Sequence, residues 1–409
     1  MIKHVLATGA AALVALAPTL ARAEFPTLNQ VIERARQRGP ASLMAAADVK
    51  VAGSTRYGAG LPPLTNPYLE VFVDRGKETV GGATVQANLW LPIELAGQRT
   101  KRLAEVDALI QWKQVARSAA QAGAVGEAVA AYGEMMVAAA RKQHALDGEK
   151  IAREEAAYVA GRFDAKDATA VDKAQADGEV ARWLQLRSEA ELSYALAKAR
   201  LAIATGDPNL DDVTGTVVID LPALHVKDGD TLAKSLLEKS PVLKQHSLEA
   251  DFFSKSKDKW EADKYAPVNF IVTAGKGEAG DFRFGGGLAW SFPLLRKNQT
   301  EIARSEADAD RAKGNLEIAK AAITARAKGF YVAYDVARQA VTTIDGIAVP
   351  AAQAVVDSSV TAWKAGKLEQ TRVFLARRDL ATARERRLDI VAVGWRAYGD
   401  LAGLVGDVP

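Results

Sequence analysis

Residue types that carry out chemistry are few in this chain and lie far apart. Its 409 residues include four histidines and no cysteine. The histidines are scattered, with no HExxH pattern to hold zinc and no G-x-S-x-G turn to present a nucleophilic serine. A sequence without cysteine excludes disulfides, zinc–thiolate sites and cysteine nucleophiles. We therefore expect no catalytic residue, no metal site and no cofactor, and the protein is not expected to be an enzyme.

Three other short motifs also lack a chemical role. GAVGEA at 123–128 and FGGGLAW at 284–290 have no Lys-Ser/Thr pair, which a phosphate-binding loop requires. The pair Met135-Met136 lies in an apolar helical stretch, which favours packing over a copper site. A formal net charge of +3 provides no dense basic face, so we expect no nucleic-acid partner.

The N-terminus MIKHVLATGAAALVALAPTLARAEF is typical of a secretory signal peptide over residues 1–23, cleaved after Ala23. Lys3 precedes an apolar run at 5–17, and Ala-Arg-Ala at 21–23 fits a cleavage site. An uncleaved membrane anchor is the alternative, but the run is shorter than the ~20 residues that span a bilayer. The chain is therefore expected to be exported, without an N-terminal lipid anchor because it has no cysteine.

The stretch that follows residue 94 predicts very long helices. No proline occurs between Glu94 and Asp207, and strong helix formers dominate. Residues 95–158 suit one helix of about 60 residues and ~90 Å, which must lie against other long helices. Gly161 in VAGRFDAKDA (159–168) offers a turn, and a second helix runs to 204 before Gly206-Asp207-Pro208.

The second half repeats this pattern. Residues 294–363 are helical in pattern and broken only at Pro350, a turn follows around Gly366, and a last helix runs to 404. LPIELAGQRTKRLAEVDA (91–108) resembles FPLLRKNQTEIARSEADA (292–309) at a separation of 201 residues. RLAIATGD and DLAGLVGD lie 200 apart, and Gly161 and Gly366 lie 205 apart. These separations indicate a tandem duplication of long helical hairpins.

We therefore expect two repeats after the signal peptide. The first covers 24–208, with a helix, a strand pair at 68–93 and a helical hairpin at 94–206. The second covers 209–409, with a helix, a strand pair at 267–293 and a helical hairpin at 294–406.

Alternating apolar residues predict the strands. TVQANLWLPI (84–93) and FRFGGGLAWSF (282–292) alternate, and each follows a candidate partner, YLEVFVDR (68–75) or PVNFIVTAG (267–275), across a glycine-rich turn. A small periplasmic sheet on a core and the wall of a membrane barrel both fit this pattern. Four strands cannot close a barrel, because even the smallest have about 8. A membrane pore would need several copies of the chain.

The order of these elements resembles the TolC-type outer membrane efflux proteins, and the strand–helix junctions resemble the cobalt-zinc-cadmium resistance branch of that family. The first junction of that branch reads P-x-E-L-x-G-x-R, matched by Pro92, Glu94, Leu95, Gly97 and Arg99. The second reads P-L-x-x-R-N-x, matched by Pro293, Leu294 and Asn298, with the arginine one place early at Arg296. The resemblance covers essentially the whole chain after residue 23.

The resemblance implies a mainly α fold with a small β part. Three copies would supply 12 strands to one outer membrane β-barrel, continued by a periplasmic α-barrel of helical hairpins. The homotrimer would be a passive exit duct for heavy-metal cations, joined to an inner-membrane pump through a periplasmic adaptor and surrounded by outer membrane lipid. Export of drugs, organic solutes or proteins by the same kind of duct is an alternative, and so is a soluble periplasmic coiled-coil adaptor or scaffold.

The resemblance also implies a role for the hairpin tips, where the tube narrows and the adaptor docks. The matching docking residues are Ala160, Gly161, Arg162, Phe163, Ala365, Gly366, Lys367 and Leu368. The charges at the aperture would be Asp164, Asp167, Glu369 and Arg372. Because Arg372 stands where the family often has an acid, we hypothesise ion pairs between Asp167 and Arg372 of neighbouring hairpins. The alternative is that both are solvated, since exposed pairs contribute under ~1 kcal/mol.

Overall fold

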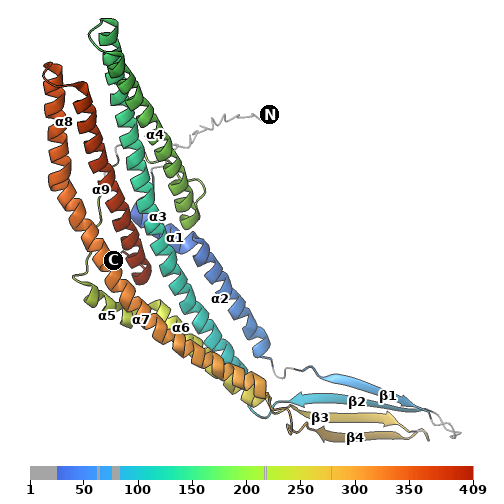
Figure 1. Cartoon of the computed structure of the whole chain (residues 1–409). Coiled ribbons are helices and arrows are strands. Elements are labelled where there is room, and N and C mark those ends of the chain that lie inside the picture. Colours follow the sequence, from blue (N-terminus) through green and yellow to red (C-terminus); the bar gives the residue numbers. More distant parts are fainter. Residues whose placement is uncertain are drawn as a thin grey trace, which may run out of the picture.

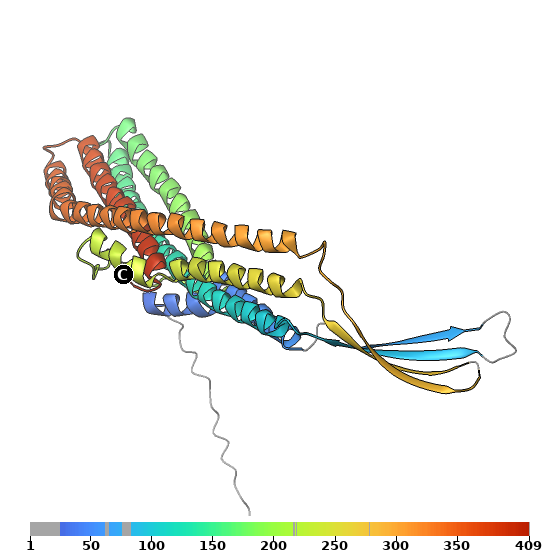
Figure 2. The same cartoon turned by 90° about the horizontal axis from the view of Figure 1, so that it is seen from below.

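The computed structural model describes residues 25–61, 65–75, 83–215, 217, 219–277 and 279–408. The expected signal peptide therefore lies outside the described residues. The molecule is elongated, with long helices along its length and one sheet extending from one end (Figure 1). In the perpendicular view the strands continue outward from the ends of the helices (Figure 2). The expected mainly helical fold with a small β part is confirmed.

Within the described ranges, the first half of the chain forms four helices and two strands. Their order is α1 (Leu28–Arg38), α2 (Pro40–Ala59), β1 (Tyr68–Asp74), β2 (Thr84–Ile93), α3 (Gln98–Asp164) and α4 (Ala170–Thr205). Helix α1 starts with a capping box, in which Thr27 and Gln30 satisfy each other's backbone N–H groups. Helices α3 and α4 form a hairpin whose tip is the end of the molecule opposite the sheet (Figure 1).

The second half has the same order of elements. It consists of α5 (Gly229–Lys239), α6 (Pro241–Asp263), β3 (Val268–Lys276), β4 (Phe282–Ala289), α7 (Gln299–Thr343), the π-helix η1 (Ile344–Ala348), α8 (Val349–Lys364) and α9 (Gln370–Val405). Helices α8 and α9 form a second hairpin, whose tip lies at the same end as the first (Figure 1). Equivalent helices begin 200 or 201 residues apart, as Pro40 and Pro241 do at the starts of α2 and α6.

Helix α3 has 67 residues, close to the length that the sequence predicted, and it extends for about 100 Å. It packs against α9 at a point where only glycine fits. A Cβ added to Gly126 would lie 2.6 Å from the Cα of Gly403 and 2.7 Å from the carbonyl oxygen of Gly399. Small residues therefore let the helices of the two halves approach closely.

The core lies where helices from both halves meet. One buried cluster centres on Tyr334 of α7 and on Trp395 and Tyr398 of α9. A second joins α1, α3 and α4 through residues such as Val31, Met135 and Leu201. Burial of these side chains holds each short helix against the long ones, because amphipathic helices gain most of their stability from such packing.

The helix between the second junction and the second tip is continuous through Pro350 and does not break there. Instead the five residues of η1 form a π-helical turn directly before α8. The wider turn accommodates a ring that has no N–H to donate and would collide with the preceding turn. Arg387 of α9 ties this segment down, because its Nε donates to Asp345 at 2.6 Å and its Nη1 to the Ile219 carbonyl at 3.0 Å.

The four strands form one antiparallel sheet in the order β1-β2-β3-β4. In the described residues neither β1 nor β4 has a partner on its outer edge. Strand β4 ends at Ala289, opposite Asn269, earlier than the expected 292. Its partner β3 begins only at Val268, because Pro267, the residue before it, has no N–H to donate to the ladder. Trp290 and Phe292 leave the sheet and pack on each other with ring centroids 4.5 Å apart.

Candidate functional site

One face of the sheet is apolar across all four strands, except for Lys276 at the end of β3. The register places Leu89 of β2 opposite Leu69 of β1 and Val272 of β3, so the apolar positions line up. Many of these side chains are open to the surroundings, including Phe284, which is 83% exposed. The aligned apolar positions are Leu69, Val71, Val73, Val85, Ala87, Leu89, Leu91, Ile93, Val268, Phe270, Val272, Ala274, Phe282, Phe284 and Leu288.

The other face carries a network of polar side chains. Asn88 is buried at its centre, and its Oδ1 accepts from Gln86 at 2.9 Å and from Thr273 at 3.0 Å. Glu70 accepts from Nε1 of Trp90 at 3.1 Å and from Asn88 at 3.4 Å. The sheet therefore separates an apolar face from a hydrogen-bonded polar face, as strands between lipid and water do.

The two strand–helix junctions share one geometry. Gly97 and Asn298, the residues before α3 and α7, both have left-handed backbones, with φ of 72° and 55°. Glycine and asparagine are the residues that tolerate this conformation best, which explains why these positions belong to the junction motifs. The next residue in each copy is glutamine, and its Oε1 accepts the N–H two residues earlier, of Ala96 or Lys297, at 2.9 Å.

The first junction also contains a buried ion pair that the sequence did not reveal. Arg102 and Glu94 form two hydrogen bonds of 2.6 and 3.0 Å, with side chains only 5% and 8% exposed. Arg102 also donates to the Leu61 carbonyl at 3.0 Å, which ties the end of α2 to α3. Pro92 lies buried within β2, two residues before Glu94, whereas Pro293 is half-buried after the end of β4.

The tips require a correction to the sequence alignment. Gly161 lies inside α3, and the first turn comes after Asp164, with Lys166 as its left-handed residue. Gly366 is the left-handed residue of the second tip, so it matches Lys166 at a separation of 200 and does not match Gly161. Both tips make the same final bonds, from Asp167 N–H to Arg162 and from Lys367 N–H to Ala362. These bonds form a Schellman motif in each tip. The sequence did not predict the first one, because its left-handed position holds Lys166 and not a glycine.

The predicted tip residues lie at or beside these turns. Ala160, Gly161, Arg162 and Phe163 occupy the last turn of α3, and Ala365, Gly366, Lys367 and Leu368 form the second turn itself. Within the described chain, Asp167 pairs with Arg162 of its own tip at 2.9 Å and not with Arg372. Asp164, Glu369 and Arg372 have no ion pair there. The two tips meet through the rings of Tyr158 and Trp363, whose centroids are 5.2 Å apart.

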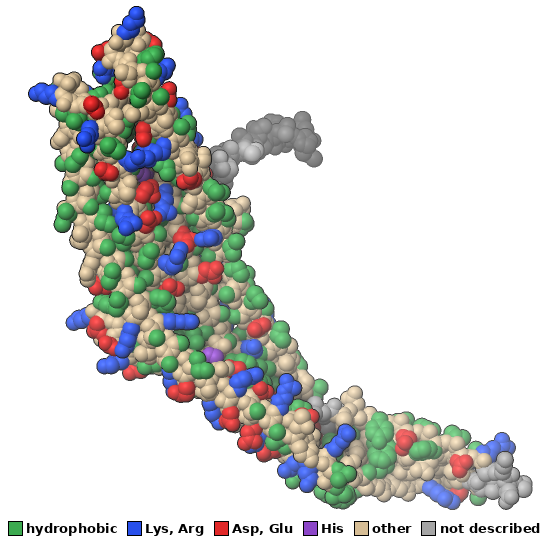
Figure 3. Space-filling view, viewed as in Figure 1, with side chains coloured by type: hydrophobic (Ala, Val, Ile, Leu, Met, Phe, Trp, Pro, Cys, Tyr) green, Lys and Arg blue, Asp and Glu red, His purple; other side chains and the backbone are tan. Residues whose placement is uncertain are grey.

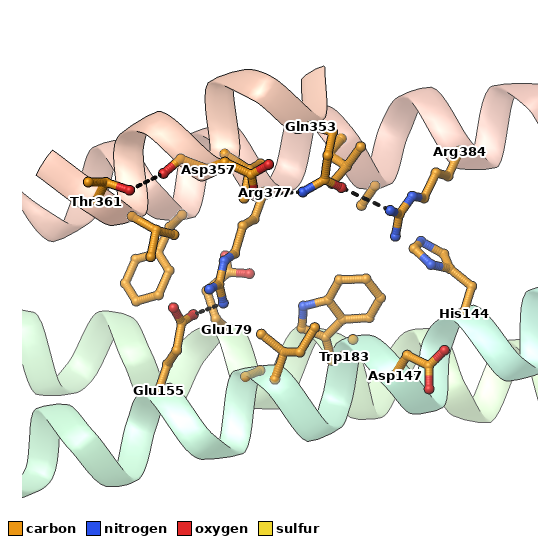
Figure 4. Close-up of a pocket in the computed structure, with 18 residues that line it drawn as sticks. His144, Asp147, Glu155, Glu179, Trp183, Gln353, Asp357, Thr361, Arg377 and Arg384 are labelled. Atoms are coloured by element: carbon orange, nitrogen blue, oxygen red, sulfur yellow. Dashed lines mark hydrogen bonds and ion pairs between the residues drawn. The ribbon is translucent and has the colours of Figure 1, made fainter. Parts of the chain in front are cut away.

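A cavity of about 490 Å³ lies between the two hairpins, below the tips (Figure 4). One titratable group of the cavity is His144. Its pKa falls to about 4 because burial penalises the charged ring and because Arg384 and Arg182 repel it, against the opposite effect of Asp147. Burial also raises the pKa of Glu155, although its ion pair with Arg377 at 2.5 Å acts in the opposite direction. No motif in the sequence indicates this cavity, because its residues come from four helices.

Charged side chains of both signs are spread over the helices on the face seen in Figure 3. The described residues contain no group of three or more His, Cys, Asp or Glu side chains able to hold a metal ion. None of the helices in the described ranges has an apolar stretch long enough to span a bilayer.

The fold is similar to that of solved outer membrane channel proteins. The chain matches the structure of the outer-membrane channel OprN with a TM-score of 0.72 and 17% identity, covering 93% of this chain and 90% of that one. It matches the outer membrane protein VceC from Vibrio cholerae with the same TM-score and 15% identity, covering 93% and 96%. The resemblance to the TolC-type channels that the order of elements indicated is thus confirmed for the fold.

Among curated proteins, the chain is similar to the cobalt-zinc-cadmium resistance protein CzcC of Cupriavidus metallidurans. The two are 22% identical over 346 residues, which cover 84% of this chain and 81% of CzcC. No protein-family model matches the chain. The similarity to CzcC agrees with the branch that the junction motifs had indicated.

Proposed function

We propose that this protein is an outer membrane channel that serves as the passive exit duct of a tripartite efflux system. The observation that carries the proposal is the sheet, which has an exposed apolar face and, within the described residues, two unpaired edges, and which lies at the end of α3, a helix about 100 Å long. Exposed apolar surface of this extent needs lipid or a partner to cover it.

A trimer would pair the free outer edges of β1 and β4. In lipid every backbone N–H and C=O must be paired, so an open sheet with two free edges is costly and a closed barrel is stable. Three copies of four strands would join edge to edge, β4 of one copy beside β1 of the next, into one barrel of twelve strands. The helical hairpins of the three copies would then surround a periplasmic tube, with the signal peptide at 1–23 removed during export.

The cargo proposed is heavy-metal cations. The support is the similarity to CzcC, whose name specifies cobalt, zinc and cadmium resistance. A passive duct needs no metal-binding site, because an inner-membrane pump and a periplasmic adaptor would deliver the ions. We place adaptor docking at the two tips, where exposed turns with the same hydrogen bonds lie side by side. The tandem repeats 24–208 and 209–409 would each contribute one hairpin.

Growth of a deletion strain tests the cargo. Sensitivity to zinc, cobalt, cadmium or copper, with unchanged tolerance of dyes and detergents, is the expected result. Sensitivity to dyes and detergents alone would indicate a drug or organic-solute duct instead.

Membrane fractionation tests the class of protein. A duct is expected in the outer membrane fraction as a trimer. Recovery only from the soluble periplasmic fraction would reject the duct and favour a coiled-coil adaptor or scaffold.

A further inference from the structure

The cavity between the hairpins has the features of a ligand site that the duct function does not require. Its volume of about 490 Å³ lies in the range of small-molecule sites, ~300–1,000 Å³. It is lined by α3 and α4 of one hairpin and by α8 and α9 of the other (Figure 4). A molecule bound there would touch both hairpins at once.

The wall of the cavity is apolar and aromatic. Trp183 of α4 projects from the first hairpin toward the second. Phe374 of α9 lines the cavity from the second hairpin. Aliphatic side chains fill the space around them, among them Ile151, Val356 and Val360. Such a wall suits an aromatic or aliphatic body, because its burial removes apolar surface from water.

The charges in the cavity favour a cation. Four carboxylates and two guanidinium groups line it, so its net charge is −2 with His144 neutral. Arg377 is engaged with Glu155, and Arg384 donates to the amide oxygen of Gln353 at 3.1 Å.

Two of the carboxylates have only neutral partners. Asp357 accepts from Nε2 of Gln353 at 2.9 Å, and Asp147 accepts from Nε2 of Gln143 at 3.0 Å. In the described structure no Lys or Arg forms an ion pair with either. Both carboxylates therefore remain available to a positively charged ligand.

We propose that this cavity binds an amphipathic organic cation, with an apolar body against Trp183 and a positive charge attracted by Asp147 and Asp357. The bound molecule bridges the two hairpins and holds them together below the tips. It is a ligand that restrains the duct, not the exported cargo.

Ethidium, a planar aromatic cation, is a suitable probe for the purified full-length protein. Its binding is measured by fluorescence polarisation, with the anion 1-anilinonaphthalene-8-sulfonate as the charge control. The double variant Asp147→Asn/Asp357→Asn is expected to bind ethidium about tenfold more weakly, as the loss of two partly exposed ion pairs predicts. Val360→Trp, which fills the cavity without changing its charge, is expected to abolish binding.

Asp335→Asn is the matched control. Asp335 on α7 also accepts from a glutamine amide, Gln339 Nε2 at 2.7 Å, but it does not line the cavity. The control is expected to bind ethidium as the parent does. Equal affinity in the double variant and the control, retained binding in Val360→Trp, or equally strong binding of the anionic probe would overturn the proposal.

Conductance in planar bilayers separates this site from the duct. Saturating ethidium is expected to lower the conductance of the parent but not that of Val360→Trp. This measurement rests on the proposed function, whereas the binding measurements do not. A protein that forms no channel yet binds ethidium with the expected variant pattern would refute the duct and leave the site standing.

Discussion

Lys166 and Gly366 hold equivalent left-handed positions in the two tip turns, with φ of 62° and 70°. A side chain in this conformation costs about 1 kcal/mol, which glycine avoids. Gly366→Ala is therefore expected to destabilise its tip by about 1 kcal/mol, and Lys166→Gly to stabilise the other by a similar amount. Hydrogen exchange of the tip amides measures both effects.

Gly161→Ala provides the contrasting variant. Gly161 lies in an exposed part of α3 with no atom within 4 Å of an added Cβ, so alanine is expected to stabilise the helix by about 0.5–1 kcal/mol. If Gly161→Ala loosened its tip while Gly366→Ala had no effect, the turn assignment described above would be wrong.

His144 makes the helical part sensitive to acid. Its pKa is about 4 in the folded chain, below the ordinary value of 6.5, because burial favours the neutral ring. The unfolded chain binds the proton first, so stability is full above pH 6.5, falls as the pH drops toward 4 and is level below it. A loss of about 2 kcal/mol is expected, given ~1.4 kcal/mol per pKa unit and partial exposure of the ring.

His144→Gln should remove this dependence. The measurement is the urea midpoint of unfolding at a series of pH values between 4 and 7. The variant is expected to lose less stability than the parent over this interval. Parallel curves for parent and variant would show that His144 does not carry the effect.

At the scale of elements, the Glu94–Arg102 pair joins β2, α3 and the end of α2. Glu94→Leu leaves the Arg102 charge buried without this carboxylate, so unfolding is expected to become easier by about 3 kcal/mol. The second repeat suggests the compensating change, because its equivalent residues are Leu295 and Ala303. The double variant Glu94→Leu/Arg102→Ala should recover much of the loss in denaturant unfolding. A single variant as stable as the parent would contradict the role of the pair.

The long elements were predictable from sequence and the fine geometry was not. Helix α3 was predicted because a proline-free run of helix formers leaves few alternatives. The tips were misaligned because glycine was the only turn signal available, and Lys166 supplies no such signal. The junction positions Gly97 and Asn298 came from the resemblance to the family motifs, and their left-handed backbone was not predicted, although both residue types tolerate it.

The cavity and the Glu94–Arg102 pair could not be predicted for a different reason. Residues such as His144, Trp183 and Arg377 come from separate helices and meet only when the two hairpins pack. The spacing of residues within one segment therefore does not predict that these side chains lie together. The strand alternation predicted the four strands, but the extent of β4 depended on where its partner begins, at Val268.

At the scale of the whole molecule, the two faces of the sheet should tolerate charge very differently. Phe284 lies on the apolar face and Gly285 on the polar one, where an added Cβ meets no atom within 4 Å. Phe284→Arg is expected to cost about 2–4 kcal/mol in a membrane and to reduce the trimer recovered from the outer membrane. Gly285→Arg should be recovered like the parent. Equal recovery of the two variants would argue against a lipid-facing sheet.

Helices α4 and α9 have 36 residues each and follow tips closed by the same hydrogen bonds. One residue inserted into either hairpin would advance its tip by about 1.5 Å and rotate all later side chains by about 100°. Natural or engineered changes of length should therefore be confined to the strand turns and to the segment 206–228. A homologue with a longer reach would have to add whole turns, about seven residues or ~10 Å at a time, to all the long helices together.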